Sequence, residues 1–264
     1  MTYTTLTVEH RGAVATVWLN RPEVHNAFDE TVIAEFSTVL RALDTDTGVR
    51  AVVLAGRGSS FCAGADLKWM RRMAAFDRAE NLRDAAKLAQ MLRLLHGLSK
   101  PTIARVHGPA LAGGTGLVAA CDIALATPTA TFGTTEVRLG LVPATIAPYV
   151  IRAIGARAAQ RYFLTGERFG AEQAQRLGLV HALCAPEWLD KHLDEVLRAV
   201  LAGAPAAQGA TKRLVTEVVQ RPLDTELAAR TSEYIAEARG SAEAHEGIDA
   251  FFARRRPSWA DPGS

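Results

Sequence analysis

The spacing of apolar residues predicts strands at the start of this chain and helices at its end. Two runs rich in β-branched and aromatic residues, 3–8 and 13–19, predict strands joined by a turn at Arg11 and Gly12. Asp29 then precedes apolar positions at helical spacing, which predicts an N-capped helix. Those positions are Val32, Ile33, Phe36, Val39, Leu40 and Leu43. The next run, 50–55, is almost wholly apolar, as in strands of parallel sheets that are buried on both faces.

The middle of the chain alternates between strand and helix patterns. A glycine-rich loop over 56–64 precedes a helix predicted over 82–98, and a buried strand is predicted over 102–106. A second glycine-rich turn over 108–116 leads to a short helix over 117–121 and a strand over 122–126. This alternation continues to about residue 183, which predicts an α/β fold.

From about residue 186 onward the pattern is helical throughout, with helices expected near 224–239 and 242–255. This tail is apolar on one side and too short to stand alone. We therefore expect a core domain over residues 1–200 and a helical region over residues 201–264. The helical region should pack on the core or on another subunit.

Composition removes several functional classes. The 264 residues are 48% hydrophobic and 22% charged, with a net charge of +2, which offers no electrostatic basis for binding nucleic acid. No apolar stretch approaches the roughly 20 residues that span a bilayer, so no membrane partner is expected. Three distant cysteines without a C-x-x-C motif argue against disulfides and a thiolate metal site. The first residues, MTYTTLTVEHRGAV, resemble no secretory signal, so we expect a cytoplasmic protein.

The sequence lacks several common catalytic motifs. The stretch from Gly108 to Thr115 has the glycines of a Walker A loop, but Gly114 stands where the phosphate-binding lysine is required. The chain has no H-E-x-x-H metal motif and no G-x-S-x-G nucleophile elbow. The seven histidines do not cluster at metal-ligand spacing. No metal ion is expected.

Two glycine-rich turns remain, FCAGADL at 61–67 and HGPALAGGTG at 107–116, each after a predicted buried strand. The second turn opens a helix, so its amides carry the positive end of the helix dipole. Amides from two separate turns could converge on one oxygen, which is how an oxyanion hole is built. Alternatively, the glycines only make room for tight packing of helix against strand. The pattern leaves both interpretations open.

Longer stretches around these turns resemble the enoyl-CoA hydratase/isomerase (crotonase) family. They are FCAGADLK, HGPALAGGTGLVAACDIALAT and FGTTEVRLGLVP, supported by NRPEVHNA, FLTGERFGAEQAQRLGLV and SAEAHEGIDAFFARRRP. The resemblance implies an α/β crotonase-like ββα spiral core with a C-terminal helical trimerisation region. It also implies an acyl-CoA thioester substrate and a homotrimer or dimer of trimers. CoA would be part of the substrate, and no separate cofactor is expected.

The resemblance also assigns roles to individual residues. The backbone amides that stabilise a thioester enolate fall on Ala65 and Gly113, and the catalytic base falls on Glu136. The position of the first glutamate in two-carboxylate hydratases is Gly116 here, which has no side chain. A single carboxylate also resembles the family's Δ3,Δ2-enoyl-CoA isomerases, in which one base shuttles a proton. The alternative for Glu136 is a surface carboxylate without a catalytic role.

The choice between hydration and isomerisation depends on a second resemblance. The stretch 134–169, TTEVRLGLVPATIAPYVIRAIGARAAQRYFLTGERF, is similar to bacterial methylglutaconyl-CoA hydratases. These also carry glycine where the first glutamate would be. We therefore favour an enoyl-CoA hydratase, a hydro-lyase, and keep the isomerase as the alternative.

By resemblance, CoA follows the segments that contain Asn26, Ala27, Ala63 and Leu67, and Lys68 lies beside them. Two further residues, Phe251 and Arg254, are expected to reach the CoA of a neighbouring subunit. The alternative is that the run from Arg254 to Arg256 is a solvated basic helix end that complements the helix dipole.

A methylglutaconyl group would bring a distal carboxylate that needs a cation. The candidates are Lys68, Arg71 and Arg72, which follow the Ala65 turn, and Arg138, which strand alternation places on the face of Glu136. The alternative is that all four are solvated surface charges.

Two rival functions are an RNA binder, which the near-neutral charge argues against, and a scaffold without activity, which would not need Glu136 and both turns.

Overall fold

The computed structural model describes residues 3–219 and 221–260. Its main sheet has six strands in the order β1-β2-β3-β4-β6-β9. Strands β1 and β2 form an antiparallel pair, and the remaining neighbours are parallel. The strands are β1 (Leu6–Arg11), β2 (Val14–Leu19), β3 (Ala51–Gly56), β4 (Thr102–Val106), β6 (Ile123–Ala126) and β9 (Ala182–Leu183).

A second, three-stranded sheet runs in the order β5-β7-β8. Its strands are β5 (Ala110–Leu111), β7 (Thr131–Gly133) and β8 (Arg168–Gly170). Strands β5 and β7 are parallel, with Leu111 opposite Gly133. The segments that follow these two strands therefore leave the sheet at the same edge.

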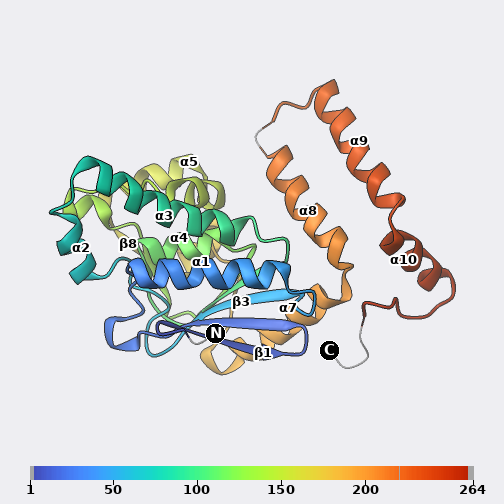
Figure 1. Cartoon of the computed structure of the whole chain (residues 1–264), viewed down its shortest axis with the longest axis horizontal. Coiled ribbons are helices and arrows are strands. Elements are labelled where there is room, and N and C mark those ends of the chain that lie inside the picture. Colours follow the sequence, from blue (N-terminus) through green and yellow to red (C-terminus); the bar gives the residue numbers. More distant parts are fainter. Residues whose placement is uncertain (1–2, 220, 261–264) are drawn as a thin grey trace.

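Helices cover both faces of the main sheet (Figure 1). Alternate residues of β3 point into different cores, since Val52 and Leu54 belong to one hydrophobic cluster and Ala51 and Val53 to the other. The larger cluster includes α1 (Glu30–Thr45), α3 (Arg78–His96), α4 (Gly113–Ala120) and α5 (Ala147–Thr165). The smaller includes α7 (Leu189–Ala202). This confirms the expected α/β core and the strand buried on both faces.

The first predicted helix is confirmed in detail. Asp29 caps α1 by accepting hydrogen bonds from the amides of Thr31 and Val32, and the six predicted apolar positions are all buried. The helix predicted over 82–98 begins earlier, at Arg78, because Asp77 and Glu80 form a capping box before the apolar pattern starts. A short helix, α2 (Leu67–Met73), was not predicted.

Two further predictions of local structure were wrong. The helix expected over 117–121 begins four residues earlier, at Gly113, so the glycine-rich turn is itself the first turn of α4. Residues Glu136–Leu139 form a 3₁₀ helix, η2, and not a strand. The strand argument that placed Arg138 on the face of Glu136 is therefore wrong, because residues two apart do not share a face of a 3₁₀ helix.

The remaining elements are η1 (Pro22–Val24), α6 (Ala171–Leu177), η3 (Pro186–Trp188), α8 (Pro205–Val218), α9 (Thr225–Arg239) and α10 (Ala242–Phe252). Helix α7 crosses the predicted domain boundary and packs on the sheet. Helices α8 to α10 extend away from the rest of the chain, and we call residues 205–260 the arm (Figure 1). Within the described residues, no helix is both long enough and apolar enough to cross a membrane.

Candidate active site

The structure brings the two glycine-rich turns into contact. Cys62 bridges Ala110, and the amide of Leu111 donates to the carbonyl of Cys62 at 2.9 Å. A Cβ built on Gly64 would lie 2.9 Å from the Cβ of Ala112 and 3.5 Å from the nitrogen of Gly113. The residue before Ala65 therefore lies directly against the residue before Gly113.

Ala65 keeps its amide free of the local backbone pairing. Phe28 forms a parallel bridge with Ala65, in which the Phe28 amide donates to the Gly64 carbonyl at 2.8 Å. The Asp66 amide donates to the Phe28 carbonyl at 3.0 Å. Such a bridge uses the groups on either side of Ala65, so the amide of Ala65 points away from Phe28 and can serve a ligand.

Gly113 supplies the second amide from the first position of α4. The first amides of a helix have no carbonyl partner within it. Ala112, just before, has φ 48° and ψ −119°, an unusual conformation for a residue with a Cβ. Its own amide donates to the Gly133 carbonyl at 2.7 Å, which holds this strained geometry in place. The strain sets the direction of the Gly113 amide.

The glycines of α4 also serve the packing interpretation. A Cβ at any of three positions would come closer than 3.0 Å to a neighbour: Gly113 to the Phe28 ring, Gly114 to the Cys62 carbonyl and Gly116 to Ile146. Helix α4 therefore fits between these neighbours only because none of the three residues has a side chain. Close packing and free amides coexist here, because a missing side chain does not remove an amide.

Glu136 lies at the same edge of the small sheet. It begins η2, three residues after β7 ends beside β5, and its carbonyl accepts from the amide of Leu141 at 3.1 Å. The side chain is half-buried, and its Oε2 is buried with no hydrogen-bond partner among the described residues. Burial raises the pKa of this carboxyl above its ordinary value. A carboxylate with an unused oxygen and a raised pKa suits a general base.

The place of a second carboxylate is filled by a hydrocarbon side chain. A Cβ on Gly116 would lie 2.7 Å from the Cβ of Ile146 and closer still to its Cγ2. Ile146 is 1% exposed and stands at the N-cap of α5. The sequence analysis could not name what replaces the missing glutamate, because 30 residues separate these two positions.

The residues expected along CoA divide into three groups. Asn26 is buried, and its side chain donates to the carbonyls of Arg57 and Ser60, both at 2.8 Å. Ala27 and Ala63 belong to the same loop system, in which the Ala63 amide donates to the His25 carbonyl at 2.9 Å. These three residues build the walls of the turn.

Leu67 and Lys68 instead lie exposed at the start of α2, where Leu67 is 80% exposed. Phe251 and Arg254 lie at the far end of the arm, remote from α2 (Figure 1). Within one chain, the structure does not bring these last two residues to the turns.

The four candidate cations differ in their partners. Arg72 donates to both carboxylate oxygens of Glu30, at 2.6 and 2.8 Å. Lys68 and Arg71 have no ion pair among the described residues, and with Leu67 and Arg72 they line a cavity of about 380 Å³. Arg138 packs against Gly166: a Cβ built on Gly166 would lie 3.0 Å from the Cγ of Arg138. Lys68 and Arg71 are the two cations available to a ligand at α2.

Arg21 connects the loops around the Ala65 turn, a role that the sequence did not indicate. Its guanidinium donates to the Ala27 carbonyl at 2.7 Å and to Asp66 at 3.0 Å, and it pairs with Asp29 at 3.2 Å. Burial alone would raise the pKa of Asp66, but hydrogen bonds from the amides of Trp69 and Lys68 and from Arg21 lower it overall. Arg21 thus ties the loop before α1 to the residue after Ala65. In the sequence, Arg21 stood out only as part of NRPEVHNA, one of the stretches that resemble the family.

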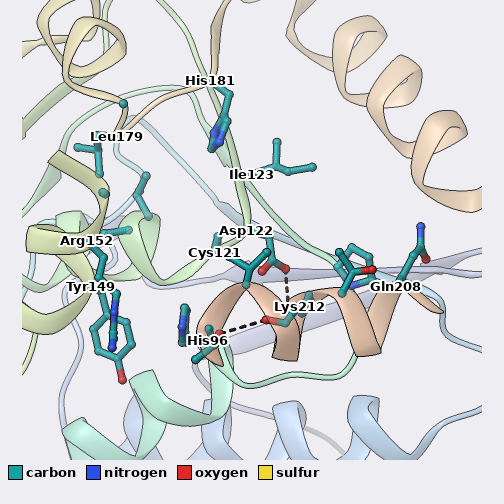
Figure 2. A pocket seen from close by; sticks show the side chains of 18 of the residues that line it. His96, Cys121, Asp122, Ile123, Tyr149, Arg152, Leu179, His181, Gln208 and Lys212 are labelled. Carbon is teal, nitrogen blue, oxygen red and sulfur yellow. Dashed lines mark hydrogen bonds and ion pairs between the residues drawn. The ribbon is translucent and has the colours of Figure 1, made fainter. Parts of the chain in front are cut away.

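A cavity larger than the one at α2 lies elsewhere. It has a volume of about 590 Å³ and opens between α8 and the body, as Figure 2 shows. Lys212 of α8 pairs with Asp122 at 2.6 Å on its wall, and burial lowers the pKa of His96 nearby. None of the predicted site residues lines it. This cavity is therefore separate from the turns and from Glu136.

Comparisons with known proteins agree with the resemblance to the crotonase family that the sequence shows. A family model described as enoyl-CoA hydratase/isomerase matches residues 9–262. The short-chain-enoyl-CoA hydratase of Clostridium acetobutylicum is 32% identical over 251 residues, covering 94% of this chain and 95% of the relative. The 2,3-dehydroadipyl-CoA hydratase of Escherichia coli is 32% identical over 255 residues, covering 96% and 98%. A crystal structure of an enoyl-CoA hydratase from Shewanella pealeana has a TM-score of 0.94 at 41% identity, covering 97% and 96%.

Proposed function

This chain belongs to the enoyl-CoA hydratase/isomerase family and has its crotonase fold, and from that premise we propose that it hydrates an enoyl-CoA thioester. The observation that carries this proposal is Glu136, whose buried Oε2 has no hydrogen-bond partner in the described part of the chain and whose pKa is raised by burial. Glu136 follows β7 and Gly113 follows β5 at the same edge of the small sheet, and Gly64, before Ala65, packs against Ala112, before Gly113.

The proposed reaction uses these groups in sequence. The Glu136 carboxylate takes a proton from water while the water oxygen bonds to C3 of the enoyl group. The electron pair of the double bond moves onto the thioester oxygen, which accepts hydrogen bonds from the amides of Ala65 and Gly113. The protonated Glu136 then gives its proton to C2. The net change is the addition of one water molecule across the 2,3-double bond.

Isomerisation of a Δ3-enoyl-CoA is a second candidate, and one observation favours it. Ile146 fills the place beside Gly116, so position 116 supplies no second carboxylate to accompany Glu136. One carboxylate suffices to remove a proton from C2 and return it to C4. The same two amides would stabilise the intermediate dienolate.

The acyl group proposed here is branched or acidic, with 3-methylglutaconyl-CoA as the specific candidate. Lys68 and Arg71, which have no ion pair among the described residues, are the cations that support an acidic group. The relative from Escherichia coli is named for a dehydroadipyl thioester, and adipic acid is a dicarboxylic acid. A distal carboxylate would pair with one of these two side chains.

We also propose that the chain assembles as a homotrimer or a dimer of trimers through its arm. Phe251 is 77% exposed and Phe252 79% exposed at the end of α10, where they have little to pack against within one chain. In an assembly, Phe251 and Arg254 would lie beside the CoA of a neighbouring subunit.

A panel of thioesters tests the proposed reaction. Crotonyl-CoA, 3-methylcrotonyl-CoA, 3-methylglutaconyl-CoA and trans-3-hexenoyl-CoA are each followed by absorbance and by mass. Hydration adds the mass of one water molecule, about 18 mass units, and removes the absorbance of the conjugated double bond. Isomerisation of the 3-hexenoyl thioester creates that absorbance without a change in mass. No turnover of any of the four would refute the proposed function.

A further inference from the structure

We propose that Ile146 is a positioning residue: its side chain occupies the bare face of α4 at Gly116 and thereby holds Glu136 in register with the Gly113 amide. This inference rests on the proposed function, because it concerns the base of that reaction. It assigns a role to a residue that does not itself touch the reacting atoms.

The contact is tight and entirely buried. Ile146 is 1% exposed, and Gly116 is buried beneath it. A Cβ at Gly116 would lie 2.7 Å from the Cβ of Ile146 but 3.7 Å from its Cα, so the isoleucine side chain alone fills this place. The two residues form a matched pair, in which one side chain takes the volume that the other lacks.

The segment that carries Glu136 has few other anchors. Thr134 is buried, and its hydroxyl donates to the Tyr162 carbonyl at 3.1 Å. From residue 135 to residue 145 no side chain is fully buried, and the next one that is belongs to Ile146. Leu139 is 63% exposed and Val142 is 75% exposed within this stretch. Side-chain packing therefore holds the loop at its two ends, with Glu136 near the first and Ile146 at the second.

Helix α4 connects this anchor to the oxyanion site. Gly116 lies three residues after Gly113, which is about one helical turn. A rigid turn of helix thus separates the position of Ile146 from the amide that would bind the thioester oxygen. Moving Ile146 would change the spacing between the base and that amide, and shifts of about 1 Å are costly to catalysis.

The same packing explains why this site has one carboxylate. A side chain at position 116 and an isoleucine at position 146 cannot both be accommodated, because their Cβ atoms would lie 2.7 Å apart. Ile146 thus places a hydrocarbon side chain against position 116, where the side chain of a second acid would otherwise begin.

The test uses Ile146→Ala with Ile154→Ala as its matched control. Ile154 is 7% exposed on the same helix α5, so both substitutions remove an equal volume from the packed interior. We expect Ile146→Ala to lower kcat about tenfold or more with little change in KM, and to move the acidic limb of the pH–rate profile to lower pH as water reaches Glu136. Ile154→Ala should lower Tm by a similar amount while leaving kcat and the limb close to wild type.

A compensating pair keeps the proposal testable if one variant folds poorly. Gly116→Ala should be strongly impaired, and Gly116→Ala combined with Ile146→Gly should recover kcat relative to Gly116→Ala alone, since the remaining Cα lies 3.7 Å away. Glycine is tolerated at an N-cap, so the second substitution need not break α5.

The outcomes separate this inference from the proposed function. A wild-type protein that turns over no enoyl-CoA would refute the proposed function, and the positioning role with it. Active wild type with equal kcat losses in Ile146→Ala and Ile154→Ala, an unmoved acidic limb, or no recovery in the double variant would overturn the role of Ile146 alone.

Discussion

The body and the arm of this protein use their apolar residues in different ways. Helix α1 buries seven residues and α7 buries four leucines, whereas α8, α9 and α10 bury one residue each. The arm meets the body through a few polar contacts: Arg50 donates to the Trp259 carbonyl at 2.5 Å, and Lys212 pairs with Asp122 at 2.6 Å. The body completes its packing within one chain, and the arm does not.

The body and the arm therefore differ in the kinds of residues that they contribute. The groups for which we propose a direct chemical role, Glu136 and the amides of Ala65 and Gly113, all lie in the body, where close packing can hold them. The arm presents Leu223, Ile235, Ile248, Phe251 and Phe252 to its surroundings. These exposed apolar groups are the ones through which we propose that the chain assembles. The predictions below test this division.

The largest expected effect comes from Glu136→Gln in the body. The substitution keeps the size of the side chain and removes its proton-accepting carboxylate, so kcat should fall about 10²–10⁴-fold. KM and the oligomeric state, which depends on the arm, should not change. Steady-state kinetics and light scattering measure both. Glu172→Gln, at an exposed position on α6, is the control and should keep full activity. Activity of Glu136→Gln within twofold of wild type would show that another group is the base.

The converse change removes the apolar groups of the arm. Fully burying a phenylalanine stabilises a contact by roughly 1.5–3 kcal/mol, so replacing both Phe251 and Phe252 by serine should dissociate the assembly. Light scattering at micromolar concentration should give the mass of a trimer or hexamer for wild type and a smaller mass for the variant. Leu82→Ser, which changes a side chain 64% exposed on the body, should leave the mass unchanged. A wild-type monomer would contradict the proposed role of the arm.

The pH dependence of Glu136 gives a smaller and more specific effect. Burial raises its pKa above the ordinary 4.5, so activity should fall on acidification with a midpoint above pH 4.5. The stability of the fold depends on pH in the opposite direction from activity. The folded protein binds this proton more tightly than the unfolded chain, so stabilisation is complete below pH 4.5 and is lost as the pH rises through the folded pKa.

Thermal unfolding checks that sign directly. Glu136→Gln removes the cost of a buried charge, so its Tm should exceed that of wild type at pH 7, and the difference should shrink toward pH 4. A wild-type advantage at neutral pH would mean that the carboxylate has a stabilising partner.

The smallest expected effect concerns the cations at α2. Exposed charge pairs contribute roughly 0.2–1 kcal/mol, so Lys68→Ala or Arg71→Ala should lower kcat/KM for 3-methylglutaconyl-CoA about 2–5-fold and spare crotonyl-CoA. Arg72→Ala is the matched control, since Glu30 already occupies its guanidinium. Equal losses on both substrates would instead assign the cation to CoA or to folding.

Local patterns in the sequence predicted much of this fold. The helix capped by Asp29 and the strand Thr102–Val106 follow directly from periodicity and capping chemistry, which act over a few residues. The predictions failed where local signals conflict. Glycines suggested a loop at 113–116, yet they form helix there, because the surrounding packing admits only a bare helix.

The candidate site shows the same division more sharply. The two turns could be singled out from residue type and spacing, and Glu136 from the resemblance of its stretch to the crotonase family. The roles of Arg21 and Ile146 could not, because each acts through a partner 45 or 30 residues away in the chain, Asp66 and Gly116. The Arg138 prediction failed for a related reason, since its face depended on a 3₁₀ turn that the sequence did not indicate.

By itself, then, the sequence determined which residues can accept a proton, which amides can be free and which helices have an apolar face, because these are properties of residue type and short-range spacing. Only the tertiary structure decided that the Gly64 and Gly113 turns touch, that a hydrocarbon side chain fills the space beside Gly116, and that the arm is left with exposed phenylalanines. Those outcomes depend on which distant segments meet, and the close packing of a protein interior allows one side chain at most in each place.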